Sequence, residues 1–433
     1  MTNLVRLSTL MLRGNWRQKL FGLALLGLLT VLTNPSAQAQ TFTVLHSFTG
    51  GADGSGPQSG VTFDRAGNIY GTTAYGGIAN GCEGCGVVYK LSHVGQGWIA
   101  NPLYNFKGPA QDDGVTPTAG VVFGPDGTLY GTTYRGGTNN FGTVFQLRPP
   151  ANACKSVSCP WNETILHAFG DLPDSEYPGQ GNLVFDTAGN LFGTTIYGGG
   201  YELDCDDQSC GAAYEMSRTN GVWTENVICP LGSCTFPGFW PMAGLTFDTA
   251  GNLYGTVTNT SGGVFELLPQ ANGSWLSNTL YSFFSQPEFD PAGGVILDAA
   301  GNVYGTTAGG GTGGGGTVFE LVKSGNTWSF SVLYNFPSSG MHQLPGPQAN
   351  LTMDTAGNLY GTTLFGGAMD CGMVFKLSPA GGSWNLTPLH GFTCEADGGK
   401  PFSNVVFGTD GNLYGTASIG GAYGSGVVWQ ITL

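Results

Sequence analysis

The chain has 433 residues, of which 41% are hydrophobic and 10% are charged, and its formal net charge is −14. An acidic balance of this size argues against nucleic acid and anionic membrane surfaces as partners, because both carry negative charge.

The first 39 residues have the pattern of a secretory leader. A basic segment precedes an apolar run over residues 20–32, and Ala37-Gln-Ala39 is a small-residue cleavage site. The basic residues are Arg6, Arg13, Arg17 and Lys19. We predict that residues 1–39 are removed and that residues 40–433, with a net charge of −18, form a single secreted or periplasmic domain. No later apolar stretch reaches membrane-spanning length, so no membrane insertion is expected after cleavage.

After the leader, a near-identical segment returns seven times. Its central glycine, in Leu-Tyr-Gly-Thr-Thr or a close variant, recurs at positions 71, 131, 193, 255, 305, 361 and 415. Spacings of 50 to 62 residues indicate a repeat architecture.

Each unit contains four short segments with strand character, separated by Gly, Pro, Asp and Asn turns. In the sixth unit they are residues 350–354, 359–363, 372–377 and 384–392, which we name a, b, c and d. Four antiparallel strands repeated radially are typical of β-propeller blades.

The ends of the chain favour a closed ring. Residues 41–48 match a d strand with no a, b or c before it, and the last unit ends after its c strand. We therefore predict an all-β, seven-bladed β-propeller in which the N-terminal strand completes the last blade, which removes exposed sheet edges. A β-solenoid and an open stack of hairpins are the alternatives, but neither explains the displaced d strand.

The repeated residues fit a sheet. The Asp-x-Ala-Gly-Asn sequence between a and b predicts a hairpin with glycine at positive φ. The aromatic residue before the central glycine, Tyr70 in the first unit, is interpreted as packing between blades rather than as a binding stripe. For the glycine, we expect that a neighbouring sheet leaves no room for a side chain.

All ten cysteines follow the leader, an even number in a compartment that permits disulfides. The expected pairs are Cys82 with Cys85, Cys154 with Cys159, Cys205 with Cys210, Cys229 with Cys234 and Cys371 with Cys394. The Cys82-Glu-Gly-Cys85 spacing also suggests a redox or zinc site, but its glycine-rich context without a second ligand pair favours a disulfide.

In a propeller the d–a and b–c connections share one face. By this strand assignment, 16 of the 28 carboxylates lie on that face. Its basic residues are only Lys107, Arg135 and Lys400. We expect this face to bind Ca²⁺, or a cationic or polyhydroxylated ligand, because hard cations take several oxygens from flexible loops. The candidate ligands are Asp53, Asp112, Asp113, Asp174 and Asp397. The alternative is a solvated acidic rim that keeps the protein in solution.

Catalytic residues are harder to identify. The innermost strands have almost no ionisable residue, so a catalytic site would have to come from loops. His46, His167 and His390 occupy a d-strand position that Tyr104, Tyr281 and Tyr334 fill elsewhere, which indicates an aromatic slot. Only His342 lies in a d–a loop, and it has no visible partner.

The recurrent Asp-x-Ala-Gly-Asn-Leu-Tyr-Gly-Thr-Thr, followed by Gly-Gly and Thr-Val-Phe-x-Leu, resembles the Gloeo/Verruco (GloVer) tandem repeat of exported bacterial proteins over residues 41–433. Members of that family commonly end in a surface anchor, and none is visible before Leu433. The resemblance implies no defined catalytic residues. We predict a monomeric binding or scaffold module for an extracellular glycan or protein rather than an enzyme; the alternative is a metal-assisted lyase or hydrolase, for which His342 is the weak catalytic candidate.

Overall fold

The computed structural model describes residues 40–79, 82–95, 97–150, 160–170, 174–199, 210–230, 240–258, 262–284, 286–325, 327–338 and 346–433. Residues 42–432 belong to one compact unit. The predicted leader and His342 lie outside the described residues. In the described ranges, no helix is long and apolar enough to cross a membrane.

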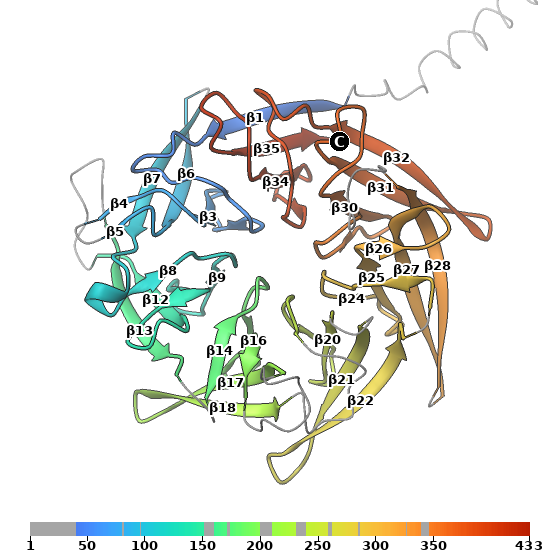
Figure 1. Cartoon of the computed structure of the whole chain (residues 1–433), viewed down its shortest axis with the longest axis horizontal. Coiled ribbons are helices and arrows are strands. Elements are labelled where there is room, and N and C mark those ends of the chain that lie inside the picture. The colour runs from blue at the N-terminus through green and yellow to red at the C-terminus, as the bar shows by residue number, and fades with distance from the viewer. Residues whose placement is uncertain are drawn as a thin grey trace, which may run out of the picture. The chain divides into compact units, whose positions relative to one another are not determined.

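Seven sheets, each containing four antiparallel blade strands, surround a central axis in the described part of the chain (Figure 1). The a strands are innermost: β2 (Thr62–Phe63), β9 (Val122–Phe123), β15 (Val184–Phe185), β19 (Thr246–Phe247), β24 (Ile296–Leu297), β29 (Thr352–Met353) and β33 (Val406–Phe407). The b strands are β3 (Ile69–Thr73), β10 (Leu129–Thr133), β16 (Leu191–Gly198), β20 (Leu253–Val257), β25 (Val303–Thr307), β30 (Leu359–Thr363) and β34 (Leu413–Ala417). The c strands are β6 (Val87–Val94), β12 (Thr143–Arg148), β17 (Ala212–Thr219), β21 (Gly263–Pro269), β27 (Gly314–Ser324), β31 (Met373–Ala380) and β35 (Val427–Thr432). The outer d strands are β7 (Gly97–Asn105), β13 (Asn162–Ala168), β18 (Val222–Pro230), β22 (Trp275–Ser282), β28 (Thr327–Pro337), β32 (Ser383–Gly391) and β1 (Thr41–Ser47). The predicted all-β, seven-bladed propeller is confirmed.

The ring closes as expected. β1 pairs with β35, and the seventh sheet has the order β1-β35-β34-β33. The N-terminal strand therefore supplies the outer strand of the last blade. Closure leaves the ring without the unpaired edge that an open array would expose.

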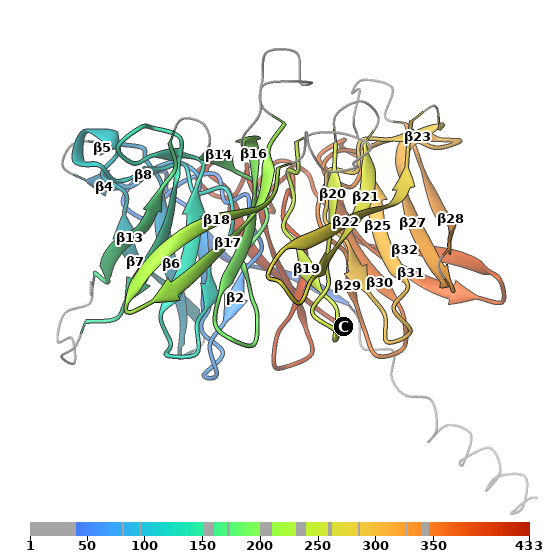
Figure 2. The ribbon, with the colours of Figure 1, turned by 90° about the horizontal axis from the view of Figure 1, so that it is seen from below.

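The d–a and b–c connections carry short strands of their own on one face of the ring, which we name the loop face. β8 (Gly114–Val115) pairs with β11 (Arg135–Gly136), and β23 (Glu288–Phe289) pairs with β26 (Gly309–Gly310). β14 (Ser175–Pro178) pairs with β16, and β4 (Ile78–Ala79) with β5 (Cys82–Glu83). Figure 2 shows β4, β5, β8, β14 and β23 along the same edge of the ring.

The a–b hairpins are built as predicted. In the first blade, Asp64 Oδ1 accepts hydrogen bonds from the backbone N–H groups of Ala66 and Asn68, both at 2.9 Å, and Gly67 has a φ of 80°. Asp64 Oδ2 accepts from the hydroxyl of Tyr70 at 3.0 Å. The aspartate thus ties the turn to the following strand, a structural role that excludes it from the candidate ligands.

The aromatic residue of each b strand packs between blades, as predicted. The Tyr70 ring meets Phe123 of the next blade edge-on, with 5.0 Å between centroids, and also approaches Trp161. Tyr130, Phe192 and Tyr360 make the same edge-on contact with the a strand of the blade that follows.

The explanation expected for the central glycine is wrong. Gly71 pairs with Tyr89 on strand c of its own blade, and a Cβ on Gly71 would lie 2.4 Å from the Tyr89 hydroxyl oxygen. The glycine therefore makes room for an aromatic ring of the same sheet, not for a neighbouring sheet. The other six glycines lie against a c-strand aromatic in the same way.

Two expected disulfides are present, Cys82 with Cys85 and Cys371 with Cys394. Cys210 and Cys229 are also disulfide-bonded. Their expected partners, Cys205 and Cys234, and the expected pair Cys154 and Cys159 lie outside the described residues. No free cysteine occurs within the described ranges.

Candidate functional site on the loop face

Three histidines of the d strands each hydrogen-bond an aspartate seven residues later, in the d–a connection. Nε2 of His46 lies 3.0 Å from Asp53 Oδ2, and the corresponding bond from His390 to Asp397 is 2.9 Å. In the first blade Tyr104 takes the histidine's role and donates to Asp113 Oδ2 at 2.7 Å. We name each such pair a bracket, because it holds the loop against the strand that precedes it.

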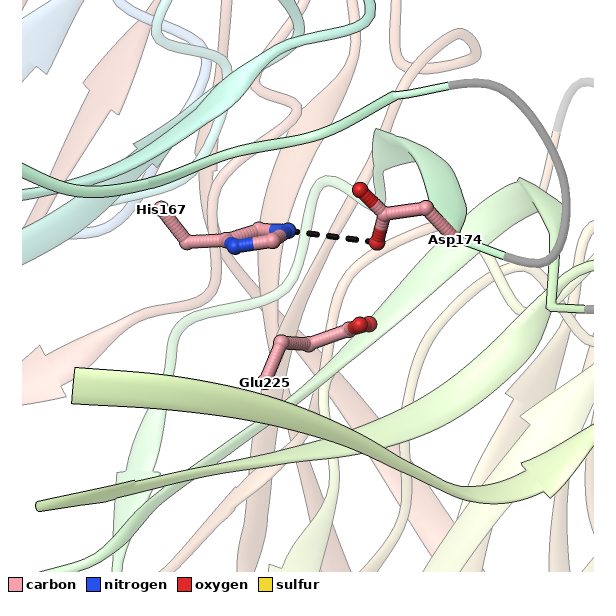
Figure 3. Close-up of side chains that lie close together, drawn as sticks. All are labelled: His167, Asp174 and Glu225. Carbon is pink, nitrogen blue, oxygen red and sulfur yellow. Dashed lines mark hydrogen bonds and ion pairs between the residues drawn. The ribbon is translucent and has the colours of Figure 1, made fainter. Parts of the chain in front are cut away.

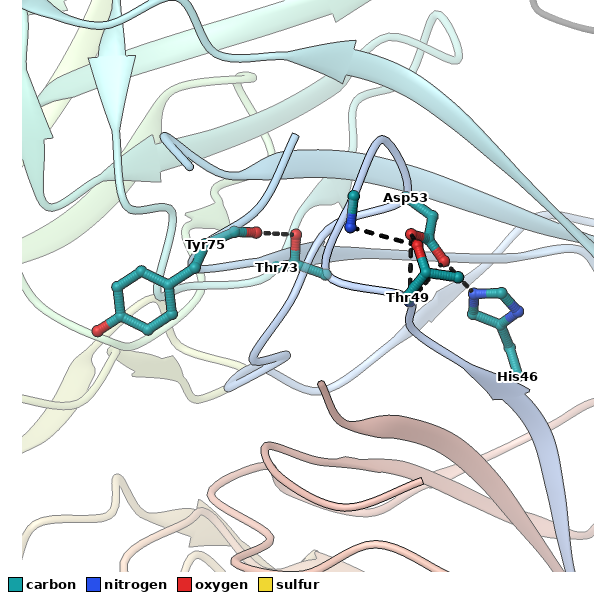
Figure 4. A network of polar contacts seen from close by, with 6 residues as sticks. His46, Thr49, Asp53, Thr73 and Tyr75 are labelled. Atoms are coloured by element: carbon teal, nitrogen blue, oxygen red, sulfur yellow. Dashed lines mark hydrogen bonds and ion pairs between the residues drawn. The ribbon is translucent and has the colours of Figure 1, made fainter. Parts of the chain in front are cut away.

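The bracket at Asp53 shows how the aspartate is used (Figure 4). Both the backbone N–H and the hydroxyl of Thr49 donate to its carboxylate. Burial raises the pKa of Asp53, but the hydrogen bonds from His46 and Thr49 outweigh this and hold the pKa below its ordinary value. Asp397 has the same arrangement with Thr393 and His390. These carboxylates already have the donors that a bound cation would have to displace.

The five predicted metal ligands do not form one shared site. Asp53, Asp113, Asp174 and Asp397 belong to four different junctions between blades, and Asp112 is exposed beside the buried Asp113. Among the described residues, a single group of three or more His, Cys, Asp and Glu side chains has ligand atoms that all lie within 4.8 Å of one another. Of the predicted ligands, it contains only Asp174.

That group consists of His167, Asp174 and Glu225, which we name the junction cluster (Figure 3). His167 comes from β13 of the second blade, Asp174 directly precedes β14, and Glu225 comes from β18 of the third blade. Nε2 of His167 lies 3.2 Å from Asp174 Oδ1, and the Glu225 side chain reaches from its strand toward both.

The pKa values of the two carboxylates in the junction cluster are shifted in opposite directions. Burial raises the pKa of Glu225, and the neighbouring Asp174 raises it further, to well above its ordinary value. For Asp174 the burial effect is outweighed by the hydrogen bonds from His167, Glu225 and the Ser175 backbone, so its pKa is lowered. A protonated Glu225 carboxyl that donates to Asp174 is consistent with both shifts.

Glu225 is not among the site residues predicted from the sequence. The signal lies in the cross-strand register, because Glu225 lies opposite Met216 at a position that other d strands fill differently. Residues at the equivalent position, opposite an apolar residue of strand c, are Ala100, Glu163, Ser277, Phe330 and Leu386. Phe42 of β1 takes the same position in the last blade, because it lies four residues before His46 as Leu386 lies four before His390. Phe330 stacks on Tyr281 of the preceding blade, and Phe42 stacks on His390. The fold therefore accepts apolar residues at this position.

A second polar feature opens at the ring axis, where the d–a connections enter the a strands. A cavity of about 220 Å³ is lined by the segments that precede or begin six of the a strands, and no ionisable side chain lines it. This agrees with the expected scarcity of ionisable residues along the channel. We name this cavity the channel mouth.

Part of the channel mouth is fixed by amide side chains. Asn182 Oδ1 accepts from the backbone N–H of Gly120 at 2.7 Å, and Asn350 Oδ1 accepts from Gly294 at the same distance. Gln58 and Gln180 also line the cavity. Neither side-chain amide has a hydrogen-bond partner within the part of the chain that the structure describes, so both amides are available to a ligand.

The ring resembles several solved structures at low identity. A putative oxidoreductase (glucose dehydrogenase) from Thermus thermophilus is 17% identical, covers 73% of this chain and 96% of its own, with a TM-score of 0.41. A protein from Lactobacillus plantarum is 12% identical over 76% of this chain and 83% of its own, with a TM-score of 0.47. An ulvan lyase is 10% identical over 77% of this chain and 84% of its own, with a TM-score of 0.47. Similarities of this size carry no argument about the chemistry of this chain.

No curated protein matches the sequence. A sequence model described as the Gloeobacter/Verrucomicrobia repeat matches residues 27–203 and 241–433.

Proposed function

This chain belongs to the Gloeobacter/Verrucomicrobia repeat family, and from the ring that its repeats build we propose that it is an exported binding module whose ligand enters the channel mouth. The ligand we propose is neutral and rich in hydroxyl groups, such as a sugar unit of an extracellular glycan. The observation that carries the proposal is a cavity lined by amides and backbone groups with no ionisable side chain.

The chemistry of the lining supports this ligand class. Gln58 and Gln180 each offer an acceptor and two donors, which suit sugar hydroxyls. Met242 and Phe402 add apolar surface for the carbon face of a ring. A volume of about 220 Å³ is smaller than the roughly 300–1,000 Å³ typical of pockets for drug-sized ligands, so one sugar unit is the expected occupant.

The negative charge of the loop face also limits which class of glycan is expected to bind. Asp53, Asp113, Asp174 and Asp397 lie on the loop face at four junctions between blades, and the chain as a whole is acidic. A face of this sign repels sulfated and uronic-acid polymers and leaves neutral or cationic ligands favoured. The disulfides at Cys82 and Cys371 are compatible with the oxidising compartment in which such glycans occur.

A glycan array with neutral, uronic and sulfated members tests the proposal. The protein is expected to bind neutral glycans, and a Gln58→Ala/Gln180→Ala double variant is expected to lose that binding. Arg65→Ala, an exposed change in an a–b turn, is the control and should bind like the wild type. Equal binding by the double variant, or a preference for sulfated glycans, would contradict the proposal; capture of a protein alone would favour the protein-partner alternative.

A further inference from the structure

The junction cluster brings together three metal-ligating side chains from separate elements. His167 and Asp174 are already 3.2 Å apart, and the three ligand atoms lie within 4.8 Å of one another. A Zn²⁺ ion at about 2.0–2.2 Å from each ligand needs donor atoms roughly 3.5 Å apart, so small side-chain movements suffice. The side chains of His167 and Asp174 remain 22% and 21% exposed, which gives an ion a path to them.

The hydroxyl of Ser175, a residue that is 0% exposed, lies beside the Glu225 carboxyl. Neither this hydroxyl nor Oε1 of Glu225 has a partner with full hydrogen-bond geometry among the described residues. Buried polar groups are rarely left so, and a bound cation would satisfy them. Oε1 of Glu163 is buried in the same way, so what distinguishes the junction cluster is the imidazole of His167.

The repeat itself provides the comparison. At the position of Glu225 in two other blades the residue is apolar. Ala100 packs against the hydrophobic core around Phe48, and Phe42 stacks on His390. Blade packing therefore does not require a carboxylate there. Glu163 provides the other carboxylate, but it lies beside the Tyr104 and Asp113 bracket, which offers a phenol instead of an imidazole.

We propose that His167, Asp174 and Glu225 bind one divalent transition-metal ion, with Zn²⁺ as the test ion. One imidazole nitrogen and two carboxylates suit Zn²⁺ and its neighbours, whereas Ca²⁺ and Mg²⁺ prefer ligand sets made of oxygen alone. Three protein ligands leave a coordination position open for water or for a ligand on the loop face. This site is at the junction of the second and third blades and does not depend on the channel-mouth proposal.

Calorimetric titration of chelator-treated protein with Zn²⁺ tests the site. The wild type is expected to bind one equivalent, and Glu225→Gln is expected to bind about tenfold or more weakly. Glu163→Gln is the matched control, because it makes the same change at the same strand position in the next junction, and it should bind like the wild type. Absence of stoichiometric binding by the wild type would overturn the proposal, and so would unchanged binding by Glu225→Gln.

Two further measurements keep the test decisive if Glu225→Gln folds poorly. Co²⁺ bound to the wild type should give the strong visible absorption of a four- or five-coordinate site, and only the weak absorption of a fully hydrated ion would overturn the assignment. His167→Ala removes the imidazole ligand and leaves both carboxylates in place, and this variant is expected to bind Zn²⁺ about tenfold or more weakly. A folded His167→Ala variant that binds Zn²⁺ like the wild type would contradict the assignment.

Discussion

The hydroxyl of Thr416 donates a hydrogen bond of 2.9 Å to the backbone carbonyl of Ser59, and this contact joins the last blade to the first. The same threonine of other b strands bonds the following blade, for example Thr72 to Ala119 at 2.8 Å and Thr362 to Ser403 at 2.9 Å. The seam of the ring therefore uses the chemistry found between its other blades. The recurrence of Thr after Tyr-Gly follows from this bond.

Thr416→Val should weaken the seam. The change keeps the shape of the side chain but leaves the buried Ser59 carbonyl without this donor, which costs about 1 kcal/mol of unfolding free energy. Urea denaturation measures the loss. Thr387→Val on the exposed side of β32 is the control and should stay within about 0.5 kcal/mol of the wild type. Equal stability of the two variants would show that the hydroxyl does not contribute to closure.

Two glycines of the sixth blade should respond in opposite ways to alanine. A Cβ on Gly361 would lie 2.7 Å from the Phe375 ring, so Gly361→Ala is expected to cost about 1–3 kcal/mol through overpacking. A Cβ on Gly391 meets nothing within 4 Å, and Gly391→Ala should be neutral or slightly stabilising. Thermal unfolding of both variants checks the pair. A neutral Gly361→Ala would refute the role given to the aromatic ring.

Glu163 should make stability fall as pH rises. Burial, and then the Asp113 charge, raise the pKa of Glu163 from 4.5 to about 8. Between pH 4.5 and 8 the unfolded chain releases this proton while the folded chain keeps it, so unfolding becomes easier with rising pH. Glu163→Gln removes this dependence and should be more stable than the wild type at pH 8.5 by roughly 2–4 kcal/mol, with little difference at pH 4.5. Denaturation of each variant at both pH values measures the effect, and Glu395→Gln, at an exposed position, is the control. If Glu163→Gln and Glu395→Gln showed the same dependence of stability on pH, the prediction would be wrong.

The bracket at Asp397 should stabilise the fold equally with and without Ca²⁺. Asp397→Asn replaces an acceptor oxygen with a donor facing Thr393, so a loss of about 1–2 kcal/mol is expected in chelator and in Ca²⁺ alike. Asp112→Asn is the control, because Asp112 is exposed and its φ of 55° suits asparagine. A Ca²⁺-dependent rise of the wild-type melting temperature that disappears in Asp397→Asn would instead restore the calcium site at this loop.

Much of the fold could be predicted because the sequence repeats it. The seven glycines gave the number of blades, the displaced d strand gave the closure, and Asp64 and its equivalents gave the hairpins, since these are local patterns copied along the chain. The reason why position 71 requires glycine was missed, because the contact of Gly71 with Tyr89 depends on the cross-strand register and not on neighbours in sequence.

The candidate site was harder to predict for a related reason. His167 and Asp174 are seven residues apart, and their pairing requires the strand to lead directly into the loop that folds back on it. Glu225 comes from the next blade, and lateral packing between d strands leaves no periodic pattern in the chain. Alignment of the seven d strands would have exposed the signal, because a carboxylate at a position filled by Phe42, Phe330 or Leu386 elsewhere is an exception that the fold does not require.

The most direct test of the central claim is hydrogen exchange with and without the neutral glycan that binds best. We predict slower exchange in the segments that line the channel mouth, residues 58–60, 180–182, 242–244, 348–350 and 402–404, with the a–b turns on the opposite face unchanged. Protection confined to those a–b turns or to the outer d strands would contradict it.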